Sequence, residues 1–350
     1  MKLTRRPWKF SPLWMIAACA MVFPSSPAAA QEDPERTAVD FITPEADRAS
    51  ARGLALLAAK QHEDGSFGSG GFARDVAICG LAGMAFMAGG STPGRGPYGE
   101  HVDRCVDYIL ENTQESGFIN VAGSGSHGPM YGHGFATLFL AEAYGMTRRN
   151  DVREKLAKAV MLIENTQNSD GGWRYQPVRR DADISVTICQ VMALRAARNA
   201  GLFVSHDTID RCVTYVKRSQ NADGGFMYMI QGGQSAFPRS AAGVVALYSA
   251  GIYEGPEIDK GLKYLMENLP RGGVFNRESH YFYGHYYAVQ AMWHAGGRHW
   301  QTWYPAIRDE LIARQHDDGS WMDSICPEYG TAMACIVLQM PNNYLPIFQR

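Results

Sequence analysis

The sequence contains the stretch Gln167-Asn-Ser-Asp-Gly-Gly-Trp173, and the same pattern returns 53 residues later as Gln220-Asn-Ala-Asp-Gly-Gly-Phe226. Full copies of the form Q-x-x-D-G-[GS]-[WF] also occupy residues 61–67 and 315–321, and degenerate copies occupy 114–118 and 271–275. The first three intervals are 53 residues each, and the last two are 48 and 47. A period of this length indicates six supersecondary repeats.

Each repeat combines two helices of different character. Residues 151–166 show apolar side chains at helical spacing with charges on the opposite side, which is typical of an outer helix. Residues 184–194, 243–248 and 332–338 are apolar on nearly every side, which is typical of an inner helix. Six hairpins of this kind predict an all-α fold, an (α/α)6 toroid in one domain. An open solenoid is the alternative.

The motif itself is predicted to be structural. Its Asp-Gly pair favours a tight turn, because glycine accepts a positive φ. The aromatic residue can pack under that turn, and the glutamine amide can bind exposed backbone groups. We expect the toroid to span residues 48–340, after a linker at 31–47 and before a C-terminal tail at 341–350.

The first 30 residues have the three parts of a secretory signal peptide. A basic start is followed by an apolar run at 13–23 and by a small-residue site that ends at Ala30. Cleavage there predicts an exported protein, periplasmic or secreted, with no membrane span after the signal is removed. A lipoprotein anchored through Cys19 is the second interpretation, and a retained anchor is the third.

The remaining chain is mildly acidic. The formal net charge of −2 becomes −6 when the four positive charges of the signal leave. With no basic run, the sequence does not favour nucleic acid as a partner. Six cysteines remain after Cys19 is removed, mostly in apolar helical contexts, so buried thiols are the favoured interpretation and disulfides the alternative.

These motifs resemble those of squalene and terpenoid cyclases and of protein prenyltransferase β subunits, a superfamily of repeat proteins. The segments at Gln167 and Gln315 look like the cyclase QW motif, and the segment at Gln220 looks like the prenyltransferase form. The resemblance covers about residues 48–340. It implies an α/α toroid whose central cavity holds an isoprenoid in the enzymes. Related toroids also serve as thioester domains, but the Gly-Cys-Gly-Glu-Gln stretch they need is absent.

Polar residues at the starts of the inner segments are the candidate site. When the repeats are aligned on a shared alanine, Asp75, His133 and Asp183 fall on three consecutive inner helices, with Tyr131 and Asp181 beside them. Later repeats contribute further candidates for substrate contact: Arg239, Tyr283, His285 and Tyr329. The alternative for each acid is helix capping alone.

The resemblance assigns a role to one of these acids. Protonation-initiated cyclases carry D-x-D-D-T-A at the start of an inner helix, and Asp181-Ala-Asp183-Ile184-Ser185-Val186 is similar to it. The proton donor of that motif corresponds to Asp183. Ile184 departs from the pattern, where the cyclases have a third acid. Such a donor needs an apolar site that keeps it neutral.

The zinc chemistry of the prenyltransferases is not predicted. The two D-x-C triplets, at 103–105 and 210–212, fall at equivalent positions of outer helices and are explained by the repeat. His285 is set like the zinc histidine but lacks the other ligands. A site made from Asp75, His133 and Asp183 has acceptable ligand types but no other support. We therefore predict no metal and no cofactor.

Two functions remain open at this level. The first is an exported cyclase-like protein that binds or cyclises an apolar isoprenoid or lipid, with Asp183 as the acid. The second is a non-catalytic scaffold that binds a protein or a lipid.

Overall fold

The computed structural model describes residues 38–124, 128–147, 149–270 and 279–349. All of them belong to one compact unit, Glu32–Arg350. The expected signal peptide at 1–30, and the degenerate motif copy at 271–275, lie outside the described residues.

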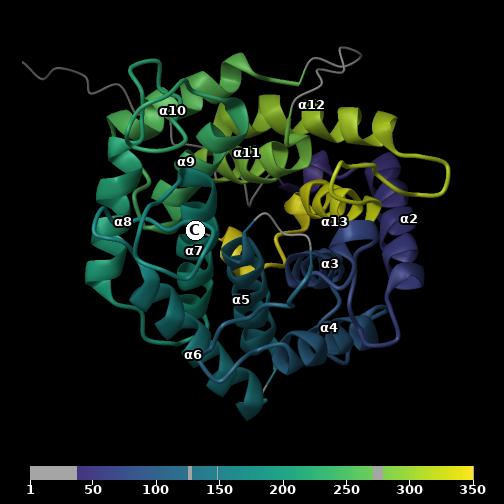
Figure 1. The fold of residues 1–350 in the computed structure, drawn as a ribbon. Coiled ribbons are helices and arrows are strands. Elements are labelled where there is room, and N and C mark those ends of the chain that lie inside the picture. The colour runs from purple at the N-terminus through teal and green to yellow at the C-terminus, as the bar shows by residue number, and fades with distance from the viewer. Residues whose placement is uncertain (1–37, 125–127, 148, 271–278, 350) are drawn as a thin grey trace, which may run out of the picture. The chain divides into compact units, whose positions relative to one another are not determined.

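The described residues form twelve α-helices that alternate between an outer and an inner layer (Figure 1). The outer helices are α2 (Pro44–Lys60), α4 (Gly99–Glu111), α6 (Asn150–Thr166), α8 (His206–Arg218), α10 (Pro256–Glu267) and α12 (Gly297–Arg314). The inner helices are α3 (Val76–Ala88), α5 (Pro129–Met146), α7 (Ile184–Asn199), α9 (Phe237–Ser249), α11 (Tyr281–Ala295) and α13 (Pro327–Leu338).

The inner helices form a closed ring. Each one contacts the next along the chain, and α13 contacts α3. The outer helices surround this ring, and α12 also contacts α2 (Figure 1). The fold is therefore the (α/α)6 toroid that the repeats predict, and not an open solenoid.

Burial separates the two layers as the sequence pattern predicts. In α7 the side chains from Val186 to Ala197 are all buried, whereas α6 buries only one side and exposes most of its charges. The toroid begins at Pro44, where the Thr43 hydroxyl caps α2 by accepting from the Ala46 N–H at 3.2 Å. None of the described helices is both long and apolar enough to cross a lipid bilayer.

The motif glycines have the positive φ that the sequence predicts. Values between 85° and 99° occur at Gly65, Gly117, Gly171, Gly224 and Gly319. The turn at Gly171 also lies against the next outer helix. A Cβ added there would sit 2.1 Å from the Arg211 carbonyl oxygen of α8. Glycine is therefore required for its conformation and for its small size.

The motif glutamines fasten each turn to the following repeat. Gln167 donates from Nε2 to the Gly171 carbonyl at 2.9 Å and to the Thr208 carbonyl of α8 at 2.8 Å. Gln61, Gln220 and Gln315 make the same pair of bonds in their own repeats. The last of these reaches Ala49 of α2 at 2.9 Å, so one repeated contact also closes the ring.

The C-terminal segment, 340–349, packs against the C-terminal ends of the inner helices. Its two short 3-10 helices are Met340–Asn342 and Pro346–Phe348, and Ile347 and Phe348 are buried. The Trp293 indole N–H of α11 donates to the Phe348 carbonyl at 3.0 Å. The expected tail is thus part of the packed unit, because its apolar residues cover the end of the inner ring.

Candidate functional site

The N-terminal end of α7 holds the carboxyl of Asp183. This side chain is fully buried, and its Oδ1 accepts a hydrogen bond from the Val186 N–H at 2.9 Å. The Asp183 N–H donates to the Trp173 carbonyl at 3.0 Å, which ties the helix start to its motif. Burial raises the pKa of the carboxyl to about 6, although Tyr228 and Arg174 favour its charged form. Asp183 is both the cap of α7 and an acid that titrates near neutral pH.

The second oxygen of Asp183 faces a polar and aromatic group. The Tyr228 hydroxyl donates to Oδ2 at 3.3 Å, and Arg174 Nε lies 3.8 Å from the same atom. The Tyr175 hydroxyl is hydrogen-bonded to that of Tyr228, and Arg174 pairs with the Asp181 carboxylate. The Arg174 guanidinium also lies over the Tyr175 ring, 5.1 Å from its centroid. Asp181 is half exposed at the protein surface, and Asp183 is buried beneath it.

Two further tyrosines complete the surroundings of Asp183. The ring of Tyr131, on α5, lies 6.1 Å from that of Tyr175. The Tyr283 hydroxyl, on α11, donates to the Ser185 carbonyl of α7 at 2.8 Å. Burial raises the pKa of both phenols, and the charge of Asp183 adds to the shift. The phenols therefore stay protonated, and four tyrosines gather near one acid.

Asp75 and Arg239 have structural contacts of their own. Asp75 is the cap of α3 and accepts from the Ala77 N–H at 2.8 Å, while burial raises its pKa. Arg239 donates from Nε to the Phe226 carbonyl at 3.0 Å and from Nη2 to the Gln234 carbonyl. Arg239 therefore supports the turn of its own repeat.

His133 does not share the helix-start position of Asp183. α5 has its cap at Gly128, so His133 lies more than one turn inside that helix. Its Nδ1 accepts from the Ile119 N–H at 3.2 Å, and its Nε2 lies 3.3 Å from the Ala159 carbonyl of α6. Burial lowers its pKa to about 4. The expected alignment is shifted here because α5 begins earlier than α7 relative to the shared alanine.

His285 and Tyr329 are buried in the packing between helices. The His285 ring lies 4.4 Å from that of Tyr281 and 5.0 Å from that of Phe237 on α9. It also lies 6.0 Å from Trp303 on outer helix α12, and burial lowers its pKa to about 3. Burial favours the neutral form of Tyr329, on α13, as well, and therefore raises the pKa of its phenol. Asp183, in contrast, is linked to Asp181 through Arg174 and to Tyr131 through Tyr228 and Tyr175. The Tyr283 hydroxyl reaches the Ser185 carbonyl, two residues from Asp183.

Side chains of the inner helices meet across the middle of the ring. The Phe135 ring of α5 lies 6.2 Å from the Tyr286 ring of α11, and the Cys189 thiol of α7 lies 3.4 Å from the Tyr287 hydroxyl. These helix pairs are not neighbours in the ring, so the contacts cross its centre. We call Asp183 and the residues around it the Asp183 group: Arg174, Tyr175, Tyr228, Asp181, Tyr131 and Tyr283. This group lies at one end of the barrel, and the C-terminal segment lies at the other.

Two family models match this chain. The prenyltransferase alpha-alpha toroid domain matches residues 44–158, and the squalene-hopene cyclase C-terminal domain matches residues 137–282. The two matches overlap and together span residues 44–282, which include most of the toroid. No curated protein matches it in sequence.

Solved structures share the fold of this toroid at low identity. The type II terpene cyclase MstE from Scytonema, in its apo form, is 13% identical with a TM-score of 0.60, over 87% of this chain and 100% of that one. An inactive α-1,6-mannanase of Salegentibacter sp. HEL1_6, in complex with alpha-1,6-mannotetrose, is 8% identical with a TM-score of 0.63, over 85% and 99%. An α-amylase from Clostridium perfringens is 10% identical with a TM-score of 0.59, over 83% and 97%.

Sequence reasoning missed three residues of the Asp183 group: Arg174, Tyr175 and Tyr228. A signal for two of them was present. Tyr175 follows Trp173 by two residues, Tyr228 follows Phe226 by two, and the two tyrosines are one repeat apart. Both tyrosines lie just after the aromatic residue of their motif, in the segments that lead to the next inner helix, and therefore not at a helix start.

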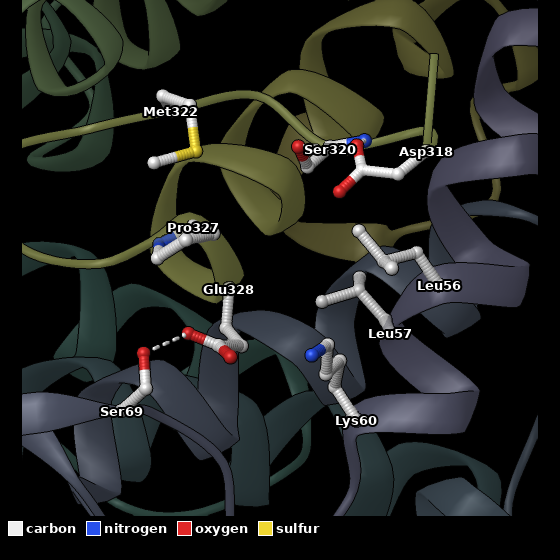
Figure 2. A pocket seen from close by; sticks show the side chains of 9 residues that line it. All are labelled: Leu56, Leu57, Lys60, Ser69, Asp318, Ser320, Met322, Pro327 and Glu328. Carbon is white, nitrogen blue, oxygen red and sulfur yellow. Dashed lines mark hydrogen bonds between the residues drawn. The ribbon is translucent and has the colours of Figure 1, made fainter. Parts of the chain in front are cut away.

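A separate pocket of about 190 Å³ lies between α2 and the segment before α13 (Figure 2). The Glu328 side chain points into it and accepts from the Ser69 hydroxyl at 2.8 Å, with Lys60 nearby. Its lining does not include the Asp183 group. Across the described part of the chain, no three His, Cys, Asp or Glu side chains are grouped so that they could hold a metal ion.

Proposed function

We propose that this toroid is an exported protein that binds an apolar, isoprenoid-class molecule next to Asp183, and that Asp183 can protonate it. The observation that carries the proposal is the state of this carboxyl. It is fully buried, its pKa is raised to about 6, and it is surrounded by tyrosines. A buried acid with one oxygen held by the helix and the other directed at aromatic residues is suited to donate a proton to an apolar ligand.

The surroundings of Asp183 suit the charge changes of such a step. Transfer of the proton to an alkene carbon would leave a carboxylate on Asp183 and a cation on the ligand. The Tyr228 hydroxyl, the Val186 N–H and the Arg174 guanidinium favour the carboxylate. The faces of the aromatic rings favour the cation. Loss of a proton from the ligand cation would then end the reaction.

The superfamily supports the choice of ligand class. MstE has been solved in complex with geranylgeranyl dihydroxybenzoate, which is named as its substrate; that structure is 13% identical, with a TM-score of 0.58 over 86% of this chain and 98% of that one. The mannanase and the α-amylase have the same fold, so the fold alone does not select isoprenoids. The selection rests on the burial of Asp183 among aromatic side chains and on the similarity of residues 181–186 to the cyclase acid motif.

A second candidate function is a non-catalytic scaffold. It is favoured by the contact of Phe135 with Tyr286 across the ring and by the packed C-terminal segment. In that case Asp183 acts only as a cap, and the toroid presents an outer surface to a protein or lipid partner.

The test uses the full chain and two variants, Asp183→Asn and Asp183→Ala. Each is incubated with squalene, geranylgeraniol and geranylgeranyl dihydroxybenzoate, and with alpha-1,6-mannotetrose as the carbohydrate control. Wild type should convert at least one isoprenoid and leave the carbohydrate intact. Turnover should fall as the pH rises through about 6, because the protonated carboxyl is the active form.

The variants separate the acid from the cap. Asp183→Asn keeps an acceptor for the Val186 N–H, so it should be folded and inactive. Asp183→Ala should lose activity and about 1 kcal/mol of stability. Unchanged turnover in Asp183→Asn would exclude Asp183 as the donor. A wild-type protein that neither converts nor is thermally stabilised by any isoprenoid would favour the scaffold.

A further inference from the structure

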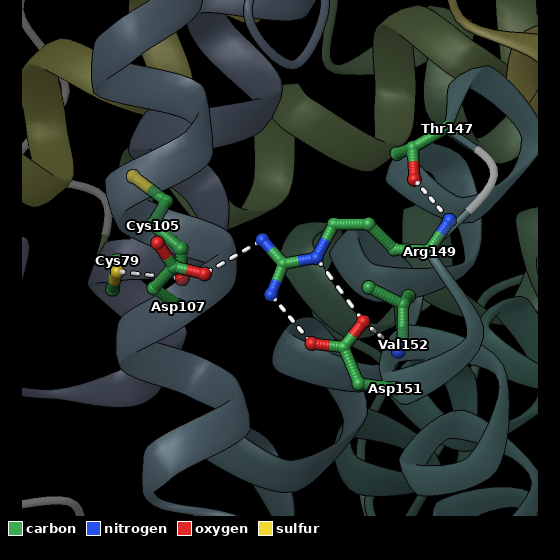
Figure 3. Close-up of polar contacts among 7 residues, drawn as sticks. All are labelled: Cys79, Cys105, Asp107, Thr147, Arg149, Asp151 and Val152. Carbon is green, nitrogen blue, oxygen red and sulfur yellow. Dashed lines mark hydrogen bonds and ion pairs between the residues drawn. The ribbon is translucent and has the colours of Figure 1, made fainter.

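Two cysteines of the first repeat meet between its inner and outer helices. Cys79 of α3 and Cys105 of α4 are both fully buried thiols. Cys79 Sγ lies 3.9 Å from the Cys105 carbonyl oxygen and 3.6 Å from that of Gly65. Gln61 Nε2 lies 3.0 Å from that same Gly65 oxygen and 3.5 Å from Cys105 Sγ. Both thiols therefore border one motif turn, and Figure 3 shows the Cys79 thiol directed at the backbone of Cys105.

The repeat explains one of these cysteines but not the pair. Cys105 and Cys212 occupy equivalent positions, in Asp103-Arg-Cys105 and Asp210-Arg-Cys212. The residue equivalent to Cys79 in α7 is Thr187, since each lies four residues after the cap of its helix. Thr187 supports its turn by accepting from the Trp173 N–H at 3.1 Å. The first repeat thus has a thiol where the third repeat has a hydroxyl, and this thiol lies against the backbone of Cys105.

We propose that Cys79 and Cys105 form a disulfide when the protein folds in an oxidising environment. The reaction needs a low-molecular-weight or protein disulfide as the oxidant. One cysteine thiolate attacks that disulfide, releases one thiolate and forms a mixed disulfide, and the second cysteine thiolate then displaces the other. Both cysteines are oxidised, the oxidant is reduced to two thiols, and the two cysteine protons end on the released thiolates.

Burial determines when the bond can form. Both side chains have no exposed surface in the folded protein, and burial raises the pKa of the Cys79 thiol well above its usual range. The folded protein should therefore react slowly, because the thiolate is the attacking species. During folding the two thiols are still accessible, and the packing of α3 on α4 then brings them together. The bond would close a loop through residues 80–104.

The experiment refolds the full chain from urea in buffers of reduced and oxidised glutathione. Free thiols are then alkylated under denaturing conditions, and tryptic peptides are identified by mass spectrometry. Trypsin separates the two cysteines, because Arg74, Arg95, Arg104 and Arg148 bound the peptides 75–95 and 105–148, each with one cysteine. We expect these peptides to be joined by a disulfide, and Cys212 to be alkylated as the matched control.

A second measurement uses thermal stability. The oxidised wild type should melt about 5 °C above its reduced form, because the cross-link restricts the unfolded chain. Cys105→Ser and Cys79→Ser should show no such difference. Recovery of peptides 75–95 and 105–148 in alkylated form at every glutathione ratio would overturn the proposal, as would linkage of Cys79 to any other cysteine. Neither result bears on Asp183, so the two proposals fail independently.

Discussion

Replacing Gly171 by alanine tests the structural account of the repeat. Gly171 has a φ of 99°, and an added Cβ would lie 2.1 Å from the Arg211 carbonyl oxygen. The conformation alone should cost about 1–2 kcal/mol. The overlap with the backbone of α8 must also move the turn, which breaks the Gln167 bond to the Thr208 carbonyl and costs about 1 kcal/mol more. We expect Gly171→Ala to lower the free energy of unfolding by about 2–3 kcal/mol.

The matched control is Gly201→Ala. Gly201 has a similar φ of 88°, but nothing lies within 4 Å of its added Cβ. This variant should therefore lose only about 1–2 kcal/mol from backbone strain. Both are compared with wild type by urea unfolding, followed by the fluorescence of the buried tryptophans. Equal losses in the two variants would refute the claim that the turn is pressed against the next outer helix.

Two further predictions concern the C-terminal segment and export. Burial raises the pKa of the Glu142 carboxyl, which accepts from the Ile347 N–H at 3.2 Å, from its ordinary value of 4.5 to about 8. Folding therefore takes up a proton at Glu142, and the free energy of unfolding should fall as the pH rises from about 4.5 to about 8. Glu142→Gln should remove most of that fall, measured by urea unfolding at pH 5 and at pH 9. An unchanged pH dependence in the variant would contradict this prediction. N-terminal sequencing of the exported protein should begin at Gln31, whereas a lipid-modified start at Cys19 would support the lipoprotein.

The sequence alone predicted the repeat architecture because the motif depends on local chemistry. A glycine with positive φ and a glutamine that forms hydrogen bonds to its turn recur at nearly regular spacing. The structure of one copy therefore predicts the structure of the others. The positions of the inner helices were also predictable from the sequence, because a helix that is buried on all sides is apolar on nearly every side.

The candidate site was predicted only in part. The position of Asp183 at a helix start was predictable because it lies in a motif-like stretch, and the structure confirms this position. His133 was misaligned because helix starts vary by several residues between repeats. Arg174, Tyr175 and Tyr228 reach Asp183 from segments outside the inner helices. Other contacts join distant parts of the chain: Phe135 packs near Tyr286 across the ring, and Phe348 accepts a hydrogen bond from Trp293. A periodicity within one repeat carries no information about them.

The most direct test of the proposed chemistry is the isotope content of the product formed in D₂O. An acid that protonates an alkene exchanges its own proton with solvent before it reacts, so each product molecule should carry one deuterium bound to carbon. The same incubation with Asp183→Asn should give no labelled product. Wild-type product without deuterium, or labelled product at an undiminished rate from Asp183→Asn, would contradict the claim that Asp183 is the proton donor.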